Sequence, residues 1–416
     1  MRMMDFTGAG GNFMEQLLRD LLGLMGGMPG SAADSSSRVE LARTLALGVA
    51  TGSRPEANVD PGERMELEQL VRVAEMHVAE LTGLPITPTG APVEALAVGP
   101  GAWAARTVED WRFLLDAMAA HTAPPAGPSD APMPATPIPG LGLADLDDEV
   151  DAGDPAELVA RLATTMGPML SAMQFGSAIG HLAQTTLGQY ELPVPRSDRR
   201  LIVVTANITR FAEQWSLPVD QSRLWICVRD LTVHTVFGRA AVADRFRQMF
   251  VDLIADTAQD AAAMLQRFEG LDLSNPESLQ HAFSDPGSWL GDQSVVGPRR
   301  SGDELTAAIA ALLGYVEHVL ELAGSRLLGG HGTVAEAWRR RQVAREPNER
   351  AAETVLGIDL GPGVVDRGTD FVSGVLDRAG EEGLSRLWTS GRTLPTPSEL
   401  GAPGLWLERI DIDGGD

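Results

Sequence analysis

The sequence predicts a mainly α-helical protein with at most a few short strands, and three observations support this fold class. Apolar residues recur at the spacing of one helix face, as in the stripe Leu67, Leu70, Val71, Ala74, Val78 and Leu81. One short β-branched run, residues 201–204, is typical of a strand. Hydrophobic residues make up 44% and charged residues 22% of the 416 positions, which is sufficient for a globular core.

Helical patterns and turn residues place the elements in order. Pro61 sits at a helix start, and the N-terminal half is expected to hold helices at 13–24, 38–50, 61–81, 156–166 and 173–187, with a helix start at 107–110 between Trp103 and Trp111. After the strand at 201–204, a central helix is predicted over 224–256. Further helices are predicted at 256–268, 276–283, 304–328, 334–343, 351–356, 371–379 and 383–388, with a turn at 361–363. Residues 394–400 are expected to pack toward Trp406.

Composition divides the chain into regions. Proline at high density between residues 122 and 152, followed by several aspartates, disfavours both helix and sheet. The predicted regions are a flexible N-terminal segment with a short helix (1–37), an N-terminal helical region (38–121), a Pro-rich acidic loop (122–152) and a helical domain (153–410).

Charge and cysteine content limit the partners and the compartment. A net charge of -24 disfavours nucleic acid and anionic membranes. An acidic surface can bind a basic protein partner, but solubility is the favoured interpretation of this charge. The single cysteine, Cys227, cannot build a disulfide framework and is expected to be an inert core thiol. No signal segment is recognised, and no apolar run reaches the ~18 residues that span a bilayer. We therefore expect a cytoplasmic protein.

Four arginines lie in and just after the predicted helix at 334–343, namely Arg339, Arg340, Arg341 and Arg345. Guanidinium groups in a cluster can bind a phosphate or a carboxylate ligand. In so acidic a chain, pairing with neighbouring carboxylates is the favoured interpretation.

Several short motifs together resemble a known family. They are Gly-Gln-Tyr-Glu-Leu-Pro at 188–193, Asn207 and Ile208 with Phe211, Leu217-Pro218 and Arg223-Leu224-Trp225 before the central helix, Leu-Gly-Ile-Asp at 356–359, and Leu-Pro-Thr-Pro-Ser-Glu-Leu at 394–400 with Pro403 and Trp406. The chain resembles, over about residues 156–409, the zincin-like metalloprotease and hydrolase group common in actinobacteria, whose members are often labelled as associated with deazaflavin-coenzyme biosynthesis.

The resemblance implies a helical zincin-like fold in which zinc is held by the two histidines of H-E-x-x-H and by a glutamate on a later helix. In this sequence Arg229 and Val233 stand at the two histidine positions, and Leu313 stands at the glutamate position. A guanidinium has no lone pair to donate, and the two aliphatic side chains have no donor atom. We expect Arg229 to pair with Asp230 or Glu317, and Val233 and Leu313 to pack as apolar core.

A relocated metal site is the alternative, with Asp230, His234, Glu317 and His318 as ligands. Neighbouring residues on a helix point about 100° apart, so Glu317 and His318 cannot easily face one metal. His234 is expected instead to be a partly buried or surface histidine. The remaining histidines have no partner at ligand spacing; they are His77, His121, His181, His281 and His331.

The favoured hypothesis is a catalytically degenerate member of this family, without a cofactor or catalytic residues, that acts as a structural or regulatory protein with a protein partner. The alternative is an active zinc-dependent metallohydrolase or peptidase that uses the relocated site. A third hypothesis is a binding module that uses a cleft between the central helix and the helix at 304–328. The sequence leaves open whether the chain is an enzyme.

Overall fold

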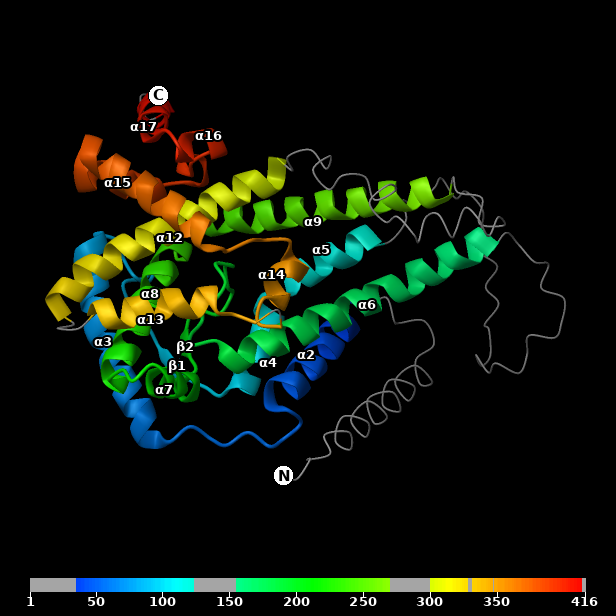
Figure 1. Cartoon of the computed structure of the whole chain (residues 1–416), viewed down its shortest axis with the longest axis horizontal. Coiled ribbons are helices and arrows are strands. Elements are labelled where there is room, and N and C mark those ends of the chain that lie inside the picture. The colour runs from blue at the N-terminus through cyan, green and yellow to red at the C-terminus, as the bar shows by residue number, and fades with distance from the viewer. Residues whose placement is uncertain (1–34, 123–154, 270–299, 328–330, 347, 414–416) are drawn as a thin grey trace, which may run out of the picture.

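The fold is mainly α-helical, as the sequence predicted (Figure 1). The computed structural model describes residues 35–122, 155–269, 300–327, 331–346 and 348–413. Their longer helices are α2 (Ser35–Thr51), α3 (Pro61–Thr82), α4 (Pro100–Asp110), α5 (Arg112–Thr122), α6 (Pro155–Thr185), α7 (Thr205–Gln214), α8 (Val219–Phe237), α9 (Ala240–Glu269), α12 (Arg300–Leu327), α13 (His331–Val343), α15 (Pro362–Ser385) and α17 (Pro403–Asp413). The shorter elements are β1 (Ala95–Ala97), β2 (Leu201–Val203), α14 (Ala351–Leu356), η2 (Arg386–Trp388), η3 (Gly391–Thr393) and α16 (Pro397–Leu400).

The two predicted helices nearest the start of the described chain are confirmed as α2 and α3. Asp60 caps α3 because its side chain accepts hydrogen bonds from the backbone N–H groups of Gly62 and Glu63. At the other end Gly83 has φ +63°, a left-handed conformation that favours glycine. The capped helix packs its apolar stripe against α8.

The helix start predicted at residues 107–110 is wrong, because these residues form the last turn of α4. That helix begins at Pro100, whose fixed φ suits the first turn. The Thr107 hydroxyl donates to the Trp103 carbonyl one turn earlier, so it does not cap a new helix. Both flanking tryptophans, Trp103 and Trp111, are fully buried.

The predicted strand is confirmed as β2, and it pairs in parallel with β1, which the sequence did not indicate. Ala95 lies opposite Leu201, and Ala97 lies opposite Val203. The Ala-Leu-Ala sequence of β1 lacks the β-branched residues that usually identify a strand.

Two predicted helix boundaries are wrong in the middle of the chain. The helices predicted at 156–166 and 173–187 form one helix, α6, which continues through Pro168. Conversely, the predicted central helix is two helices, because α8 ends at Phe237 and α9 begins at Ala240. Gly238 caps the end of α8, and its N–H donates to the His234 carbonyl. The segment 256–268 is a continuation of α9.

The C-terminal helices predicted at 304–328, 334–343 and 351–356 are confirmed as α12, α13 and α14. The predictions at 361–363 and 371–379 are wrong in extent, since α15 begins at Pro362 and kinks at Gly380. Helix α15 crosses α12 at very short range, because a Cβ on Gly368 would lie 1.8 Å from the Ala310 carbonyl oxygen. Only glycine fits at this crossing.

The segment 394–400 does pack toward Trp406, as expected. Thr396 and Glu399 form a capping box at the start of α16. The Trp406 indole N–H donates to the Thr393 carbonyl at 2.6 Å, and Arg409 pairs with Glu399 at 2.6 Å.

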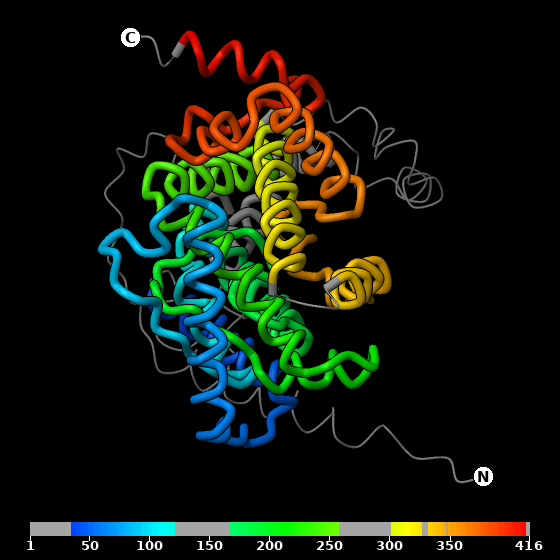
Figure 2. The backbone as a smooth tube through the Cα atoms, turned by 90° about the vertical axis from the view of Figure 1, so that its left-hand side faces the viewer, coloured from blue at the N-terminus to red at the C-terminus, as the bar shows by residue number. Residues whose placement is uncertain are grey.

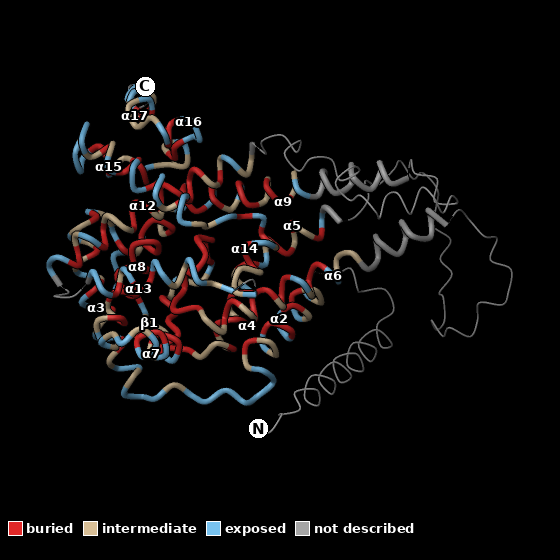
Figure 3. Tube along the Cα trace, in the orientation of Figure 1, coloured by how far each residue is buried: buried red, intermediate tan, exposed pale blue. Residues whose placement is uncertain are grey.

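Buried residues from both halves of the chain form one core cluster (Figure 3). Helix α17 lies at the opposite end of the molecule from α2 (Figure 2). The segment 301–326 of α12 is long and apolar enough to cross a membrane, but 67% of its apolar window is buried inside the protein, as in a core helix. The helices predicted at 13–24 and 276–283, and the loop at 122–152, lie outside the described residues.

Candidate functional site

The candidate site lies where the turn after α6 meets helix α8. Asp230 is fully buried, and its Oδ1 atom accepts a hydrogen bond from Arg229 Nη1 at 2.7 Å. Its Oδ2 atom accepts from the backbone N–H of Tyr190 at 3.2 Å, while Arg229 Nη1 also donates to the Tyr190 carbonyl at 3.0 Å. Gly188 allows this approach, because a Cβ there would lie 2.2 Å from Asp230 Oδ2. Arg229 therefore fastens α8 to the turn.

The electrostatics of this pair follow from its burial. Burial raises the pKa of the Asp230 carboxyl, and the Arg229 guanidinium and the N–H groups of Tyr190 and Gln189 oppose that rise. Both carboxylate oxygens accept hydrogen bonds, which is the pattern of the ionised form. A buried aspartate in this position depends on its arginine.

Arg229 also stacks on helix α13. Its guanidinium carbon lies 4.6 Å from the centroid of the Trp338 ring, and that of Arg341 lies 5.0 Å from the same ring. Arg341 in turn pairs with Glu191 at 2.9 Å, so the turn, α8 and α13 are linked through two arginines. The expected partner Asp230 is confirmed. Arg229 is not in an ion pair with Glu317.

The interpretation of the four arginines as partners of carboxylates is confirmed for three of them. Arg340 pairs with Glu336, Arg341 with Glu191, and Arg345 with Glu353. The fourth, Arg339, is exposed and donates to the Ala335 carbonyl. Within the described residues, these four side chains do not form a common anion site.

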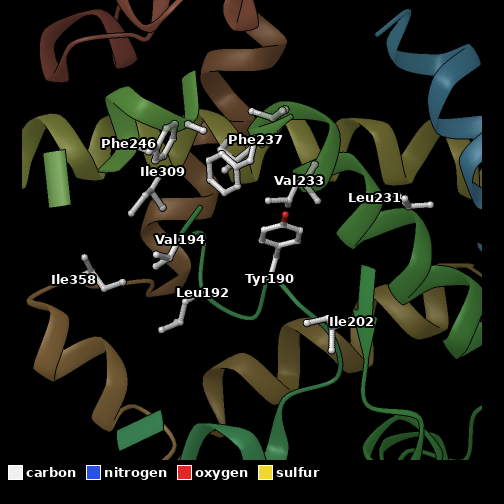
Figure 4. Close-up of a cluster of buried hydrophobic side chains, with 14 of the residues drawn as sticks. Tyr190, Leu192, Val194, Ile202, Leu231, Val233, Phe237, Phe246, Ile309 and Ile358 are labelled. Carbon is white, nitrogen blue, oxygen red and sulfur yellow. The ribbon is translucent and has the colours of Figure 1, made fainter. Parts of the chain in front are cut away.

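His234 lies one turn after Asp230 and is buried, more fully than the partly buried or surface position that the sequence predicted. Its Nδ1 atom lies 3.1 Å from the Tyr190 hydroxyl, to which the Gln189 amide donates. Figure 4 shows the Tyr190 ring with its hydroxyl pointing toward Val233 on α8. The Tyr190 hydroxyl and His234 Nδ1 thus share a hydrogen bond in which the imidazole is neutral at neutral pH. Burial lowers the pKa of His234 to about 4 and raises that of Tyr190.

The lowered pKa of His234 makes stability depend on pH. In the unfolded chain the imidazole has its ordinary pKa near 6.5, so between that value and about 4 the unfolded state binds the additional proton. The stability contributed by the neutral ring is complete above the unfolded pKa and is lost as pH falls toward the folded pKa. From about pH 7.5 to about pH 5 we expect a loss of about 2 kcal/mol from this group. Urea unfolding at both pH values measures it.

The control for this prediction is His234→Gln, which retains an acceptor for Tyr190 but does not titrate. Other buried carboxyls titrate in both proteins, so the difference between wild type and variant isolates the histidine. An equal pH dependence in both proteins would contradict the assignment.

Arg229 and Leu313, which the sequence placed at metal-ligand positions, line one pocket of about 140 Å³. The pocket lies between α8, α12, α13 and the start of α15, and its lining includes Glu191, Arg229, Leu313, Val316, Glu317, Trp338, Arg339, Gln342, Val343, Leu360, Pro362, Val365 and Asp366. Val233 is buried among Tyr190, Phe237 and Ile309 (Figure 4). Burial raises the pKa of Glu317, opposed by Arg339 and Arg229. Val233 and Leu313 thus both contact apolar core, as expected.

The donor set at these positions does not fit zinc. Arg229, Val233 and Leu313 offer no lone pair, and a catalytic zinc site needs three protein ligands and a water. In the part of the chain that the structure describes, no group of three or more His, Cys, Asp or Glu side chains could hold a metal ion.

The four residues of the alternative site have separate surroundings. Asp230 is engaged by Arg229, and His234 by Tyr190. Glu317 lines the pocket, whereas the neighbouring His318 lies 3.0 Å from Glu381 on α15. This divergence is the one expected for neighbours on a helix.

Sequence reasoning missed the buried cation that supports the turn from the other side. Arg196 pairs with Asp110 at 3.2 Å, donates to the Gln189 carbonyl at 3.2 Å, and lies over the rings of Trp103 and Trp111. No spacing in the sequence indicated this arginine, because its partners come from the separate segments 103–111 and 189. Cys227 is buried, and burial raises its pKa, as expected for an inert thiol.

Comparisons with known proteins agree with this architecture. The sequence pattern of the zincin-like metallopeptidase family matches residues 38–407. No curated protein matches the chain. The crystal structure of a candidate hydrolase with a novel fold from Chloroflexus aurantiacus is similar, with a TM-score of 0.57 and 21% identity, covering 89% of this chain and 98% of that one. That likeness concerns the fold, whereas the family pattern extends over most of the sequence, and so the chain belongs to the zincin-like metallopeptidase family.

Proposed function

We propose that this chain is a non-catalytic member of its family, which works as a structural or regulatory protein in the cytoplasm and binds a protein partner. The observation that carries the proposal is the arrangement of Arg229. Its guanidinium occupies the position expected for the first metal ligand and is held by Asp230, the Tyr190 carbonyl and the Trp338 ring. A guanidinium fixed at this point has no lone pair with which to coordinate a metal ion.

The residues around Arg229 support the same proposal. Asp230 stands where the glutamate of H-E-x-x-H would activate a metal-bound water, but here both its oxygens are engaged by the protein. The lone buried Cys227 supports a reducing compartment. Net charge of -24 supports a basic partner.

Metal analysis of the purified full chain tests the proposal. After dialysis against metal-free buffer we expect far less than one zinc ion per chain, because the residues that the structure describes contain no set of ligands to retain it. His234→Ala is the matched variant, and it should not change the metal content. Stoichiometric zinc that survives dialysis and is lost on His234→Ala would overturn the proposal in favour of an active relocated site.

A further inference from the structure

We infer that the pocket beside Arg229 binds an aliphatic chain that ends in a primary ammonium group. This inference deepens the proposed function by naming a ligand class for the non-catalytic site, and it rests on that proposal. Three features carry it, namely the apolar walls of the pocket, its small volume, and a carboxylate without a protein partner.

The walls of the pocket suit an aliphatic chain. Apolar side chains come from three helices and the segment before α15, and they are Leu313, Val316, Trp338, Val343, Leu360, Pro362 and Val365. Val343 is 62% exposed at the end of α13, where it offers apolar surface to an entering chain. The volume of about 140 Å³ is below the roughly 300–1,000 Å³ of pockets for drug-sized ligands. The pocket therefore accepts a short, narrow group such as a single side chain.

The charges of the pocket decide between an ammonium group and a carboxylate. Arg229 is neutralised by Asp230 at 2.7 Å, and Glu191 is neutralised by Arg341 at 2.9 Å. Among the described residues, Glu317 makes no hydrogen bond or ion pair, although it is half-buried on α12.

Two further charges line the pocket. Asp366 adds a second negative charge near the start of α15, and the exposed Arg339 offsets one of the two carboxylates. The pocket therefore keeps one net negative charge, shared between the carboxylates of Glu317 and Asp366. An anionic ligand would face the carboxylates of both Glu317 and Asp366, and the exposed Arg339 compensates only one of them, which disfavours a carboxylate.

The ammonium group could belong to a lysine side chain of a partner or to a free alkylamine. Both present the same three N–H donors at the end of a four- to six-carbon chain. The acidic surface of the protein attracts either one.

Calorimetric titration of the full chain, in a buffer that contains a chelator, tests the inference with n-hexylammonium and its anionic counterpart, hexanoate. We expect saturable binding of one hexylammonium per chain and no measurable binding of hexanoate. Glu317→Gln should weaken hexylammonium binding by about tenfold or more, because it removes the charge from the acceptor. Glu321→Gln, an exposed residue one turn further along α12, is the matched control and should have no effect.

A second titration, with a lysine peptide, distinguishes a partner's lysine side chain from a free alkylamine. If acetyl-Ala-Lys-Ala-amide binds more tightly than hexylammonium, the ligand is a lysine side chain, and the reverse order identifies a free amine. Equal or tighter binding of hexanoate, no binding of either ammonium probe, or full affinity in a folded Glu317→Gln variant overturns the inference. If that variant does not fold, the comparison of hexylammonium with hexanoate on the wild-type protein still tests whether the pocket prefers an ammonium group. A zinc-free chain that binds no amine refutes this inference alone, whereas stoichiometric zinc refutes the proposed function.

Discussion

A variant that combines Arg229→His, Val233→His and Leu313→Glu is expected to retain one zinc ion per chain through dialysis, which we do not expect of the natural sequence. Positions 229 and 233 lie one turn apart on α8, and Leu313 lines the same pocket as Arg229 from α12. Two imidazoles, one carboxylate and a water complete a tetrahedral site. Zinc content after dialysis measures the gain, and a zinc concentration at a hundredfold excess over Kd should stabilise the fold by about 2.7 kcal/mol.

The control is the double variant Arg229→His and Val233→His with Leu313 retained, which lacks the third ligand and should lose its zinc on dialysis. A folded triple variant that also fails to retain zinc would show that positions 229, 233 and 313 do not correspond to the ligand positions of the family. The proposed absence of catalysis would then lose its structural basis.

The fold could be predicted where local pattern and end signals agree. Helix α3 has an apolar stripe, an N-terminal cap at Asp60 and a terminating Gly83, so both of its ends were predicted closely. The break between α8 and α9 could not be predicted, because apolar residues continue across Gly238 and no proline interrupts them. Strand β1 was missed because Ala-Leu-Ala acquires strand geometry only from its pairing with β2.

Only the part of the candidate site that the family motifs cover could be predicted from the sequence. The motifs placed Arg229 and Leu313 near each other, and the structure places both in one pocket. The partners of Arg229 were not predictable in full, because Trp338 and the Tyr190 carbonyl come from distant parts of the chain. Periodicity identifies which face of a helix is buried, but not which distant backbone carbonyl that face meets.

Replacing Arg229 by Met is expected to lower the free energy of unfolding by about 3–5 kcal/mol, because it leaves the Asp230 carboxylate buried without its cation. The Asp230 side chain is 0% exposed and that of Arg229 is 8% exposed, so solvent does not screen the pair. Methionine keeps much of the apolar volume of the arginine stem. The decrease in the free energy of unfolding therefore comes from losing the positive charge and its contact with the Trp338 ring. Urea unfolding followed by circular dichroism measures the change.

Two variants separate this charge effect from general damage to α8. In Arg229→Met with Asp230→Asn, the amide oxygen can still accept from the Tyr190 N–H, and no charge remains buried, so most of the lost stability should return. Arg340→Met removes an exposed pair whose side chains are 65% and 49% exposed, and it should cost less than about 1 kcal/mol. If the double variant is no more stable than Arg229→Met alone, Arg229 acts mainly through Trp338 packing, and the ion pair is not what holds α8 to the turn.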